Sequence, residues 1–236
     1  PSPSPSPSPS RPMRRARHTG AMVSRALETL LEEAKAQRLL GATLPIEAHI
    51  SNGLAFVHVL RRQRSRHIVD LGSGGGVPAL IIAELLPDTT VWMIERSANR
   101  AAWLRSAVAA LDLDDRCDVI AAAAEEAARM PERAGWADAV TARSFAPPAT
   151  TAECACRFLR PDGLLIVSEP PADPLAPPRW PHDGLAPTGL QPEHSETFDD
   201  TTLQTLQRVG PIDPRLPRRD AVTRKRPLFV SGVERP

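Results

Sequence analysis

The sequence predicts an α/β protein built on a doubly wound, mostly parallel sheet. The first observation behind this prediction is the stretch 67–95, HIVDLGSGGGVPALIIAELLPDTTVWMIE, which has the pattern of a strand, a glycine-rich turn, a helix and a second strand. The second observation is that short apolar runs continue to alternate with helical segments over the rest of the chain. In a sheet of this kind, ligands bind at the carboxyl ends of the strands.

Residue types define the two strands and the helix of this stretch. The apolar residues of the strand Ile68 to Leu71 are β-branched or Leu, which is typical of a strand covered on both faces. The helix spans Val77 to Leu86; Pro78 fits its first turn, where a missing N–H costs no hydrogen bond, and Pro87 ends it. The second strand runs from Val91 to Ile94. Together these elements form a βαβ unit.

A helical segment precedes the βαβ unit. Residues 1–20 are a Pro-Ser repeat followed by basic residues, which cannot bury a core, so we place the folded domain at 21–236. Within this domain we expect a helical cap at 21–62, whose second helix begins after Pro45, and an α/β core at 67–236. The first helix is predicted by apolar residues that share one face: Val23, Leu27, Leu30, Leu31 and Ala34.

The elements expected after the second strand continue the alternation of helix and strand. They are a helix capped by Ser97, a strand Asp118 to Ala121, a strand Ala137 to Ala142, a helix through Cys154 to Leu159, a turn at Pro161 to Gly163, a strand Leu164 to Val167, a Pro-rich loop Pro170 to Gly189, a helix near Thr201 to Val209, and a final strand Leu228 to Ser231.

Length and composition limit the kinds of protein that this sequence can encode. A chain of 236 residues with a net charge of +1 is expected to form one domain with tails. Its cysteines, Cys117, Cys154 and Cys156, do not provide a disulfide framework or the spacing of a zinc site. No apolar run reaches about 18 residues, so we expect no membrane segment and a cytoplasmic location. We expect a monomer.

The glycine-rich turn limits the class of ligand that this site can bind. A dinucleotide-binding turn would need a third Gly where Val77 stands, and a phosphate-binding P-loop would need a Lys that this turn lacks. The pattern that remains is D-x-G-x-G-x-G, carried by Asp70, Gly72, Gly74 and Gly76. It resembles the motif of class I methyltransferases that use S-adenosylmethionine (SAM), which implies a seven-stranded Rossmann-like sheet. The alternative is a glycine turn that serves the fold alone.

The physics of this turn suits a cofactor with a carboxylate and a ribose. Glycines let the backbone approach the ligand closely, and the N–H groups at a helix start attract a negative charge. Glu95, at the tip of the second strand, would accept hydrogen bonds from both ribose hydroxyls. We therefore add Glu95 to the expected cofactor residues.

Several segments together resemble one methyltransferase family. They are DLGSGGGVP (70–78), SANRAAWL (97–104), AEE (124–126), TARSFAP (141–147), EAHISN (47–52) and LPRRDAVTRKRPLF (216–229). Taken in chain order, these segments are similar to the motifs of the RsmG (GidB) family. The resemblance implies SAM-dependent methylation of N7 of a guanine in small-subunit (16S) ribosomal RNA, with the small ribosomal subunit as partner. Matched position by position and combined with the glycine motif and Glu95, the expected cofactor-binding residues are Gly72, Gly74, Val77, Glu95, Ala124, Glu125 and Arg143.

The chemistry implied by this resemblance needs no dedicated catalytic residue. Guanine N7 already carries an in-plane lone pair, so in-line positioning is enough and no general base has to act. Methylation at a pyrimidine C5 would need an activated Cys, and no cysteine lies in an obvious site for that. Methyltransferases of amino groups carry Asn/Asp/Ser-Pro-Pro-aromatic after the fourth strand, whereas this chain has Ala146-Pro147-Pro148-Ala149.

The chain departs from the family pattern at a few positions, and we expect all of them on the substrate side. Ser168-Glu169 replaces part of a Leu-Lys-Gly segment, so a cationic position has become acidic. Ala123 stands where the family has Arg, and Asn52-Gly53 where it has Asp-Ser. Phe145 and Trp180 are candidates for stacking on a base.

Alternatives remain for the charged residues and for the function. Arg143 either holds a ligand or pairs with an acid such as Glu125, and His49 is either functional or a packed helix residue. The basic stretches 61–66 and 215–226 either contact RNA phosphates or are solvated. The competing functions are a small-molecule methyltransferase, a non-catalytic SAM-binding protein and, more distantly, an NAD-dependent oxidoreductase.

Overall fold

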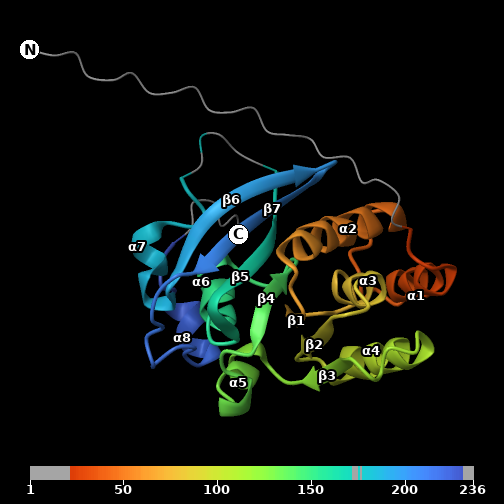
Figure 1. Ribbon diagram of the computed structural model, residues 1–236, viewed down its shortest axis with the longest axis horizontal. Helices are drawn as coiled ribbons and strands as arrows, with labels where there is room; N and C mark the ends of the chain where they lie inside the picture. Colours follow the sequence, from red (N-terminus) through yellow and green to blue (C-terminus); the bar gives the residue numbers. More distant parts are fainter. Residues whose placement is uncertain (1–21, 172–174, 176, 231–236) are drawn as a thin grey trace, which may run out of the picture.

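The computed structural model describes residues 22–171, 175 and 177–230, and its centre is a seven-stranded sheet (Figure 1). The strands lie in the order β3-β2-β1-β4-β5-β7-β6. They are β1 (His67–Leu71), β2 (Thr90–Glu95), β3 (Cys117–Ala121), β4 (Ala137–Ala142), β5 (Leu159–Glu169), β6 (Leu190–Phe198) and β7 (Thr201–Arg208). Pairs among β1 to β5 are parallel, while β7 is antiparallel to both β5 and β6. The expected doubly wound, mostly parallel sheet is confirmed.

Helices cover both faces of the sheet, and each face has its own hydrophobic core. The first core lies against α1 (Arg25–Ala36), α2 (Ile46–Gln63), α3 (Ala79–Leu85) and α4 (Ala98–Ala110). The second lies against α5 (Ala124–Ala128), α6 (Pro148–Ala155) and α7 (His182–Leu185), with α8 (Asp220–Lys225) beside α6. Neighbouring strand residues alternate between the cores; Ile68 belongs to the first and Val69 to the second.

The two helices before β1 form as predicted. Ser24 caps α1, because its side-chain oxygen accepts a hydrogen bond from the N–H of Leu27. Leu27, Leu31 and Ala34 are buried, which is the face that the apolar spacing indicates. Ser24 also donates to Glu84 of α3 at 2.5 Å, so the start of α1 is joined to the βαβ unit.

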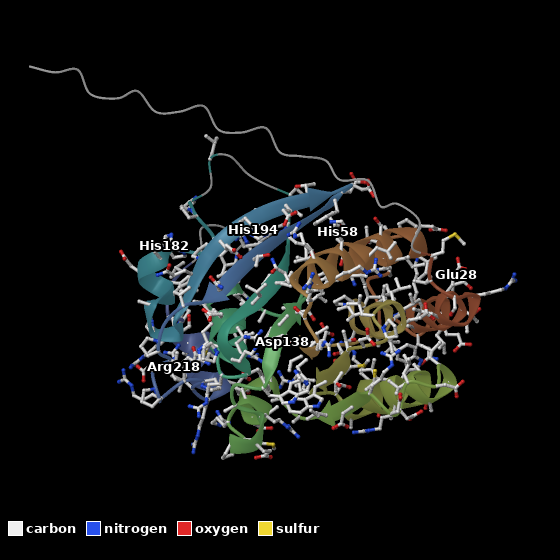
Figure 2. All side chains as sticks on the ribbon, viewed as in Figure 1. Glu28, His58, Asp138, His182, His194 and Arg218 are labelled. Atoms are coloured by element: carbon white, nitrogen blue, oxygen red, sulfur yellow. The ribbon has the colours of Figure 1, made fainter. Side chains whose placement is uncertain are left out.

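The start of β1 is hydrogen-bonded to β4, at the end of the sheet opposite the carboxyl ends of the parallel strands. A carboxylate oxygen of Asp138 accepts hydrogen bonds from the N–H groups of Arg66 and His67, at 2.7 and 2.9 Å, and the other pairs with Arg160 (Figure 2). In the same basic stretch, Arg61 donates to the carbonyl of Leu85. These residues therefore join elements of the fold.

Two helices were predicted wrongly from the sequence. The helix expected at Cys154 to Leu159 instead begins at Pro148, because proline fits a first helical turn, and Leu159 already pairs with Ala137 in the sheet. The helix expected near Thr201 to Val209 is strand β7, where buried Thr201, Leu203 and Thr205 alternate with partly buried residues. β-Branched threonines favour this extended conformation.

The last third of the chain differs from the expectation in two more places. Strand β6, within a stretch for which no element was predicted, pairs with β7 over its length. The final strand expected at Leu228 to Ser231 is absent over 228–230, which have no regular structure, and Ser231 lies outside the described residues. β6 and β7 therefore supply the sixth and seventh strands.

Candidate functional site

A cavity of about 820 Å³ opens at the carboxyl ends of the parallel strands. Its walls come from the residues that follow β1, β2, β3 and β4, together with the C-terminal segment. They include Gly72, Glu95, Arg96, Ser97, Arg100, Ala122 to Glu125, Ser144 to Pro147, Asp220, Thr223, Arg224 and Pro227. The sheet therefore gathers loops that are distant in the sequence around one space, as this architecture requires.

Gly72 is required where β1 enters the turn. Its φ is +68°, a conformation that side chains other than glycine rarely adopt. A Cβ at this position would lie 2.8 Å from Cδ2 of Phe145, so the aromatic ring occupies the space of a side chain. The backbone is thereby exposed to the cavity.

Glu95 joins the glycine turn to α4. It is 3% exposed, and one carboxylate oxygen accepts a hydrogen bond from the N–H of Gly74 at 3.0 Å while the other accepts from Ser97 at 2.8 Å. A carboxylate has about four acceptor positions, so these two bonds leave others for a ligand. Because Glu95 lines the cavity, its carboxylate is both fixed in place and available.

The other predicted cofactor residues divide into two groups. Ala124 and Glu125 line the cavity beside Gly72 and Glu95. Gly74, Val77 and Arg143 are not among the residues that line it; Gly74 donates to Glu95, and Val77 is buried in the first core. Ala123, expected on the substrate side, lines this cavity.

Arg143 lies behind the cavity in a buried polar network. Its guanidinium donates to Nδ1 of His49 at 2.6 Å, and Nε2 of His49 lies 3.1 Å from the carbonyl oxygen of Gly41. The hydrogen bonds assign the tautomer: Nε2–H donates to Gly41, and Nδ1 accepts from Arg143. Burial lowers the pKa of both side chains. His49 is therefore a packed, neutral link between α2 and the end of β4, and the partner of Arg143 is His49 rather than Glu125.

Asp70 lies beneath the glycine turn without contact with solvent. One oxygen accepts a hydrogen bond from the hydroxyl of Thr141 at 2.7 Å, and none of the residues that the structure describes forms a hydrogen bond with the other. Burial raises the pKa of this carboxyl to about 6, although the hydrogen bond from Thr141 and the charge of Arg143 oppose the rise. Asp70 thus holds the ends of β1 and β4 together.

A second, smaller cavity of about 260 Å³ adjoins the first. The two share Ser144, Phe145 and Ala146, so Phe145 lines both of them. The other walls of the second cavity include residues at the ends of β4 and β5, such as Glu169, and they also include Trp180. The two aromatic candidates for base stacking, Phe145 and Trp180, are therefore brought to one cavity.

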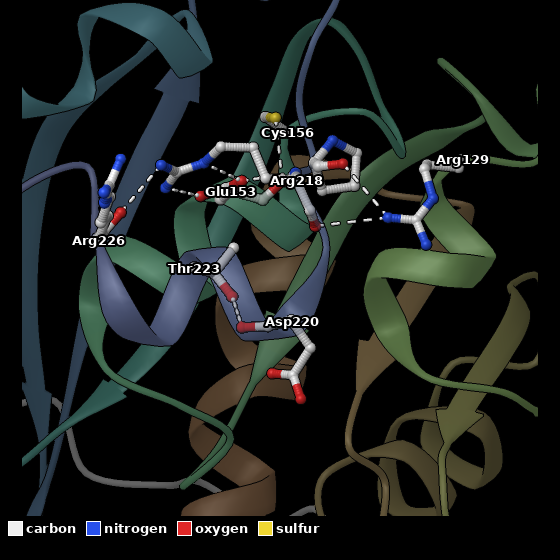
Figure 3. Close-up of polar contacts among 8 residues, drawn as sticks. Arg129, Glu153, Cys156, Arg218, Asp220, Thr223 and Arg226 are labelled. Carbon is white, nitrogen blue, oxygen red and sulfur yellow. Dashed lines mark hydrogen bonds and ion pairs between the residues drawn. The ribbon is translucent and has the colours of Figure 1, made fainter.

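The C-terminal segment is anchored to α6 by a buried ion pair (Figure 3). Glu153, whose side chain is 1% exposed, accepts two hydrogen bonds from the guanidinium of Arg218 and one from its backbone N–H. Arg129, which follows α5, donates to the carbonyls of Pro217 and Arg218. This anchor places α8 at the first cavity, where Thr223 and Arg224 form part of the wall.

Sequence reasoning assigned the basic C-terminal stretch to RNA or to solvent, and it missed this internal role. Arg215 pairs with Asp213, Arg218 with Glu153, and Arg224 with Asp220. A signal was present in the acid of the otherwise uncharged helix PATTAECA, because a buried Glu needs a cationic partner.

Three features can be tested within the described part of the chain: a nucleophilic cysteine, a metal site and a helix that spans a membrane. Cys117, Cys154 and Cys156 are buried and unpaired, and burial raises the pKa of each thiol, which does not favour a nucleophilic thiolate. Within residues 22–171, 175 and 177–230, no group of three or more His, Cys, Asp or Glu side chains is arranged to hold a metal ion. None of the helices described there has the length and apolar character to cross a membrane.

Comparison with known sequences identifies similar proteins. A sequence profile of the GidB family, described as rRNA small subunit methyltransferase G, matches residues 21–169. The chain is 33% identical over 169 residues to the ribosomal RNA small subunit methyltransferase G of Roseiflexus castenholzii, an alignment that covers 69% of this chain and 70% of the relative. It is 28% identical over 217 residues to the protein of the same name from Deinococcus deserti, with 88% of each chain covered.

Solved structures show the same fold at low sequence identity. The O-methyltransferase from Bacillus cereus in complex with SAH has a TM-score of 0.56 and 16% identity, over 79% of this chain and 92% of that chain. The O-methyltransferase TomG from Streptomyces achromogenes, in complex with SAM, also has a TM-score of 0.56 and 16% identity, over 80% and 92%. These similarities support the class I methyltransferase fold.

Proposed function

Because this chain belongs to the rRNA small subunit methyltransferase G family, we propose that it transfers a methyl group from SAM to N7 of a guanine in small-subunit (16S) ribosomal RNA. The family profile covers residues 21–169, which include the glycine turn, Glu95 and the end of β4. SAM supplies an electrophilic methyl group when bound. The small ribosomal subunit or its RNA is the partner.

The observation that carries this proposal is the arrangement around the first cavity. Gly72 presents backbone without a side chain, and Glu95 presents a fixed carboxylate with free acceptor positions. Ala122, Ala123 and Ala124 give a small, apolar wall next to Glu125. These features suit, in turn, the amino-acid part, the ribose and the adenine of SAM. Ala124 and Glu125 contact the adenine in this arrangement, and Glu95 the ribose.

The remaining predicted residues support the cavity from behind. Gly74 fixes the carboxylate of Glu95, and Val77 packs the start of the helix that follows the turn. Arg143 holds the end of β4 through His49 and lies close enough to Asp70 to affect its charge. We assign these three residues a positioning role rather than direct contact with the cofactor.

Catalysis depends on orientation in this proposal. Guanine N7 attacks with a lone pair that is already present, so the chain need only hold the base in line with the methyl group and exclude water. The second cavity adjoins the first at Phe145 and provides the place for the base. Arg96, Arg100 and Arg224 are exposed at the first cavity and are available to RNA phosphates.

The experiment uses labelled SAM, purified protein and small ribosomal subunits from cells that lack the protein. We expect label in the small-subunit RNA at a position that N7-specific cleavage identifies. Gly72→Asp is the control and should incorporate none. Calorimetry measures SAM binding separately, so loss of cofactor binding is distinguished from loss of transfer. Intact SAM binding without transfer to any ribosomal substrate would contradict the RNA assignment.

A second candidate is a methyltransferase for small molecules. The acidic Glu169 at the second cavity and the modest volume of that cavity favour it. The same assay distinguishes the two functions, because a small-molecule enzyme would bind SAM and leave the ribosomal RNA unlabelled. Screening that protein against metabolites with nucleophilic nitrogen or oxygen atoms would then identify the acceptor.

A further inference from the structure

The second cavity contains a carboxylate that the cofactor site does not use. Glu169 ends β5, and its side chain is only 10% exposed. One carboxylate oxygen accepts a hydrogen bond from the indole N–H of Trp180 at 3.0 Å, and the other forms an ion pair with Nε of Arg179 at 2.6 Å. Two partners from one segment thus hold the carboxylate at the wall of the cavity.

This carboxylate has acceptor capacity left. A carboxylate offers about four acceptor positions; the hydrogen bond from Trp180 uses one of them, and Nε of Arg179 lies in ion-pair contact with the other oxygen. The groups that fit the remaining positions are donors, and two adjacent donors fit best because the two oxygens lie side by side. The cavity therefore favours a ligand with a pair of neighbouring N–H groups.

Guanine has such a pair, and adenine does not. The Watson–Crick edge of guanine presents N1–H and the N2 amino group next to each other, whereas adenine has an acceptor at N1. Enzymes that act on an extruded base read this edge by hydrogen bonds while the ring stacks on aromatic or apolar side chains. Phe145 and Trp180 line the same cavity and supply aromatic surface.

The position of Phe145 also fits the direction of the reaction. N7 lies across the fused ring from the N2 amino group, so a guanine that meets Glu169 with its Watson–Crick edge turns N7 away from β5. The residues shared by the two cavities, Ser144 to Ala146, lie between Glu169 and the first cavity. N7 would then face the cavity that we assign to the cofactor.

The surroundings of Glu169 show that this end of the sheet is built differently from the family pattern. Asn52, another position that departs from the pattern, donates to the hydroxyls of Ser168 and Thr201, both at 3.3 Å. The departures at α2 and at the end of β5 are therefore in contact with each other. The residues that differ from the family pattern on the substrate side thus contact each other.

We propose that Glu169 is a specificity residue that recognises the N1–H and N2 amino edge of the target guanine in the second cavity. The proposal rests on the proposed function and names the group that selects the base. Trp180 and Arg179 orient the carboxylate, and Phe145 separates the base from the cofactor cavity.

The test compares Glu169→Gln with the wild-type protein on small subunits that lack the methyl group. Gln keeps the size of the side chain but offers one oxygen and turns an N–H donor toward guanine. We expect kcat/KM for N7 methylation to fall about tenfold to a hundredfold, the cost of losing a bidentate base contact, with unchanged SAM affinity. Glu196→Gln is the matched control, because Glu196 also pairs with an arginine, Arg62, but on β6.

A second measurement changes the substrate instead of the protein and compares the two proteins on it. Inosine at the mapped target position lacks the N2 amino group and keeps N7. The wild-type protein should methylate inosine less efficiently than guanosine, and Glu169→Gln should show a smaller difference between the two. Equal rates of Glu169→Gln and wild type, with no discrimination against inosine, would overturn the role of Glu169 while N7 methylation itself remained. Absence of N7 methylation by the wild-type protein would instead overturn the proposed function and the role of Glu169 with it.

Discussion

The two halves of the sheet are built by different means. Strands β1 to β4 are parallel, and each cavity-forming loop directly follows its own strand, so backbone geometry near Gly72 and Glu95 shapes the site. Strands β5, β7 and β6 form the antiparallel part of the sheet, and the cavity at the end of β5 is lined by side chains such as Phe145, Glu169 and Trp180 rather than by a glycine turn. The first cavity has one wall from a distant segment, α8, which is held by the contact between Glu153 and Arg218, 65 residues apart.

This difference separates what the cofactor requires from what the substrate requires. A cofactor that is the same in every reaction is met by turn geometry and backbone N–H groups, which tolerate little change. In the proposed function the acceptor is met by side chains of the second cavity such as Glu169 and Trp180, which are not part of the glycine turn. Variants of the glycine turn should therefore abolish SAM binding, variants at the second cavity should alter selectivity, and variants of buried polar groups in either half should alter stability.

The largest effect is expected at Gly72, and it tests whether the first half depends on backbone shape. In Gly72→Asp, the new residue must keep φ near +68°, which strains the backbone of any residue other than glycine. Its Cβ would also lie 2.8 Å from Cδ2 of Phe145. SAM binding measured by calorimetry should be undetectable, although circular dichroism should show a folded protein. Normal SAM affinity in this variant would show that the turn does not lie at the cofactor.

Removing the anchor of the C-terminal segment should have the next largest effect. Glu153→Ala leaves the Arg218 guanidinium, whose side chain is 24% exposed, without its partner, and the loss of one member of a buried pair costs about 3–5 kcal/mol. Because Arg218 is partly exposed, we expect a value near 3 kcal/mol in urea unfolding. The double variant Glu153→Met with Arg218→Met should recover much of this loss. A double variant as unstable as Glu153→Ala would argue that the pair is not the anchor.

The buried carboxyl of Asp70 should make stability depend on pH. Its pKa is raised from 3.8 to about 6, so the folded protein keeps this proton at pH values where the unfolded chain has lost it. The stability that Asp70 contributes is therefore full below about pH 4 and falls as pH rises to 6, by on the order of 3 kcal/mol. Asp70→Asn removes this dependence, so its unfolding free energy relative to wild type should increase between pH 4 and 7. A constant difference over that range would contradict the raised pKa.

The smallest effect is expected at Cys154, which lines the first cavity. Burial raises the pKa of its thiol, and methylation at N7 needs no thiolate nucleophile. Cys154→Ala should therefore keep kcat and the affinity for SAM within experimental error in the labelled-SAM assay. Loss of turnover with intact SAM binding would indicate covalent chemistry and a different acceptor.

The same contrast explains which features could be predicted from the sequence. The βαβ unit, Gly72 and Glu95 follow from patterns within 29 residues of one another, where local propensity and spacing act together. Strand β4 was predicted with its observed ends. In these places local and tertiary preferences agree.

The features that were missed depend on distant partners. The two leucines of TTLQTLQR lie three residues apart, which is a helical spacing; pairing with β5 and β6 selects the strand, in which Leu203 and Leu206 face opposite cores. Thr223 and Arg224 reach the first cavity in a segment that Glu153 and Arg129 hold in place through contacts distant in the sequence. The partner of Arg143 is fixed by the packing of α2, which brings His49 to the end of β4.

The position of α8 affects when the first cavity can form during synthesis of the protein. Synthesis proceeds from the amino end, and domains form as their residues emerge. Gly72 and Glu95 are made early, yet the wall of their cavity includes residues 220–227, which are made much later. A ribosome that is still translating this chain therefore carries a turn and a carboxylate without a closed cavity, and the complete first cavity forms only after residues 220–227 have left the ribosome.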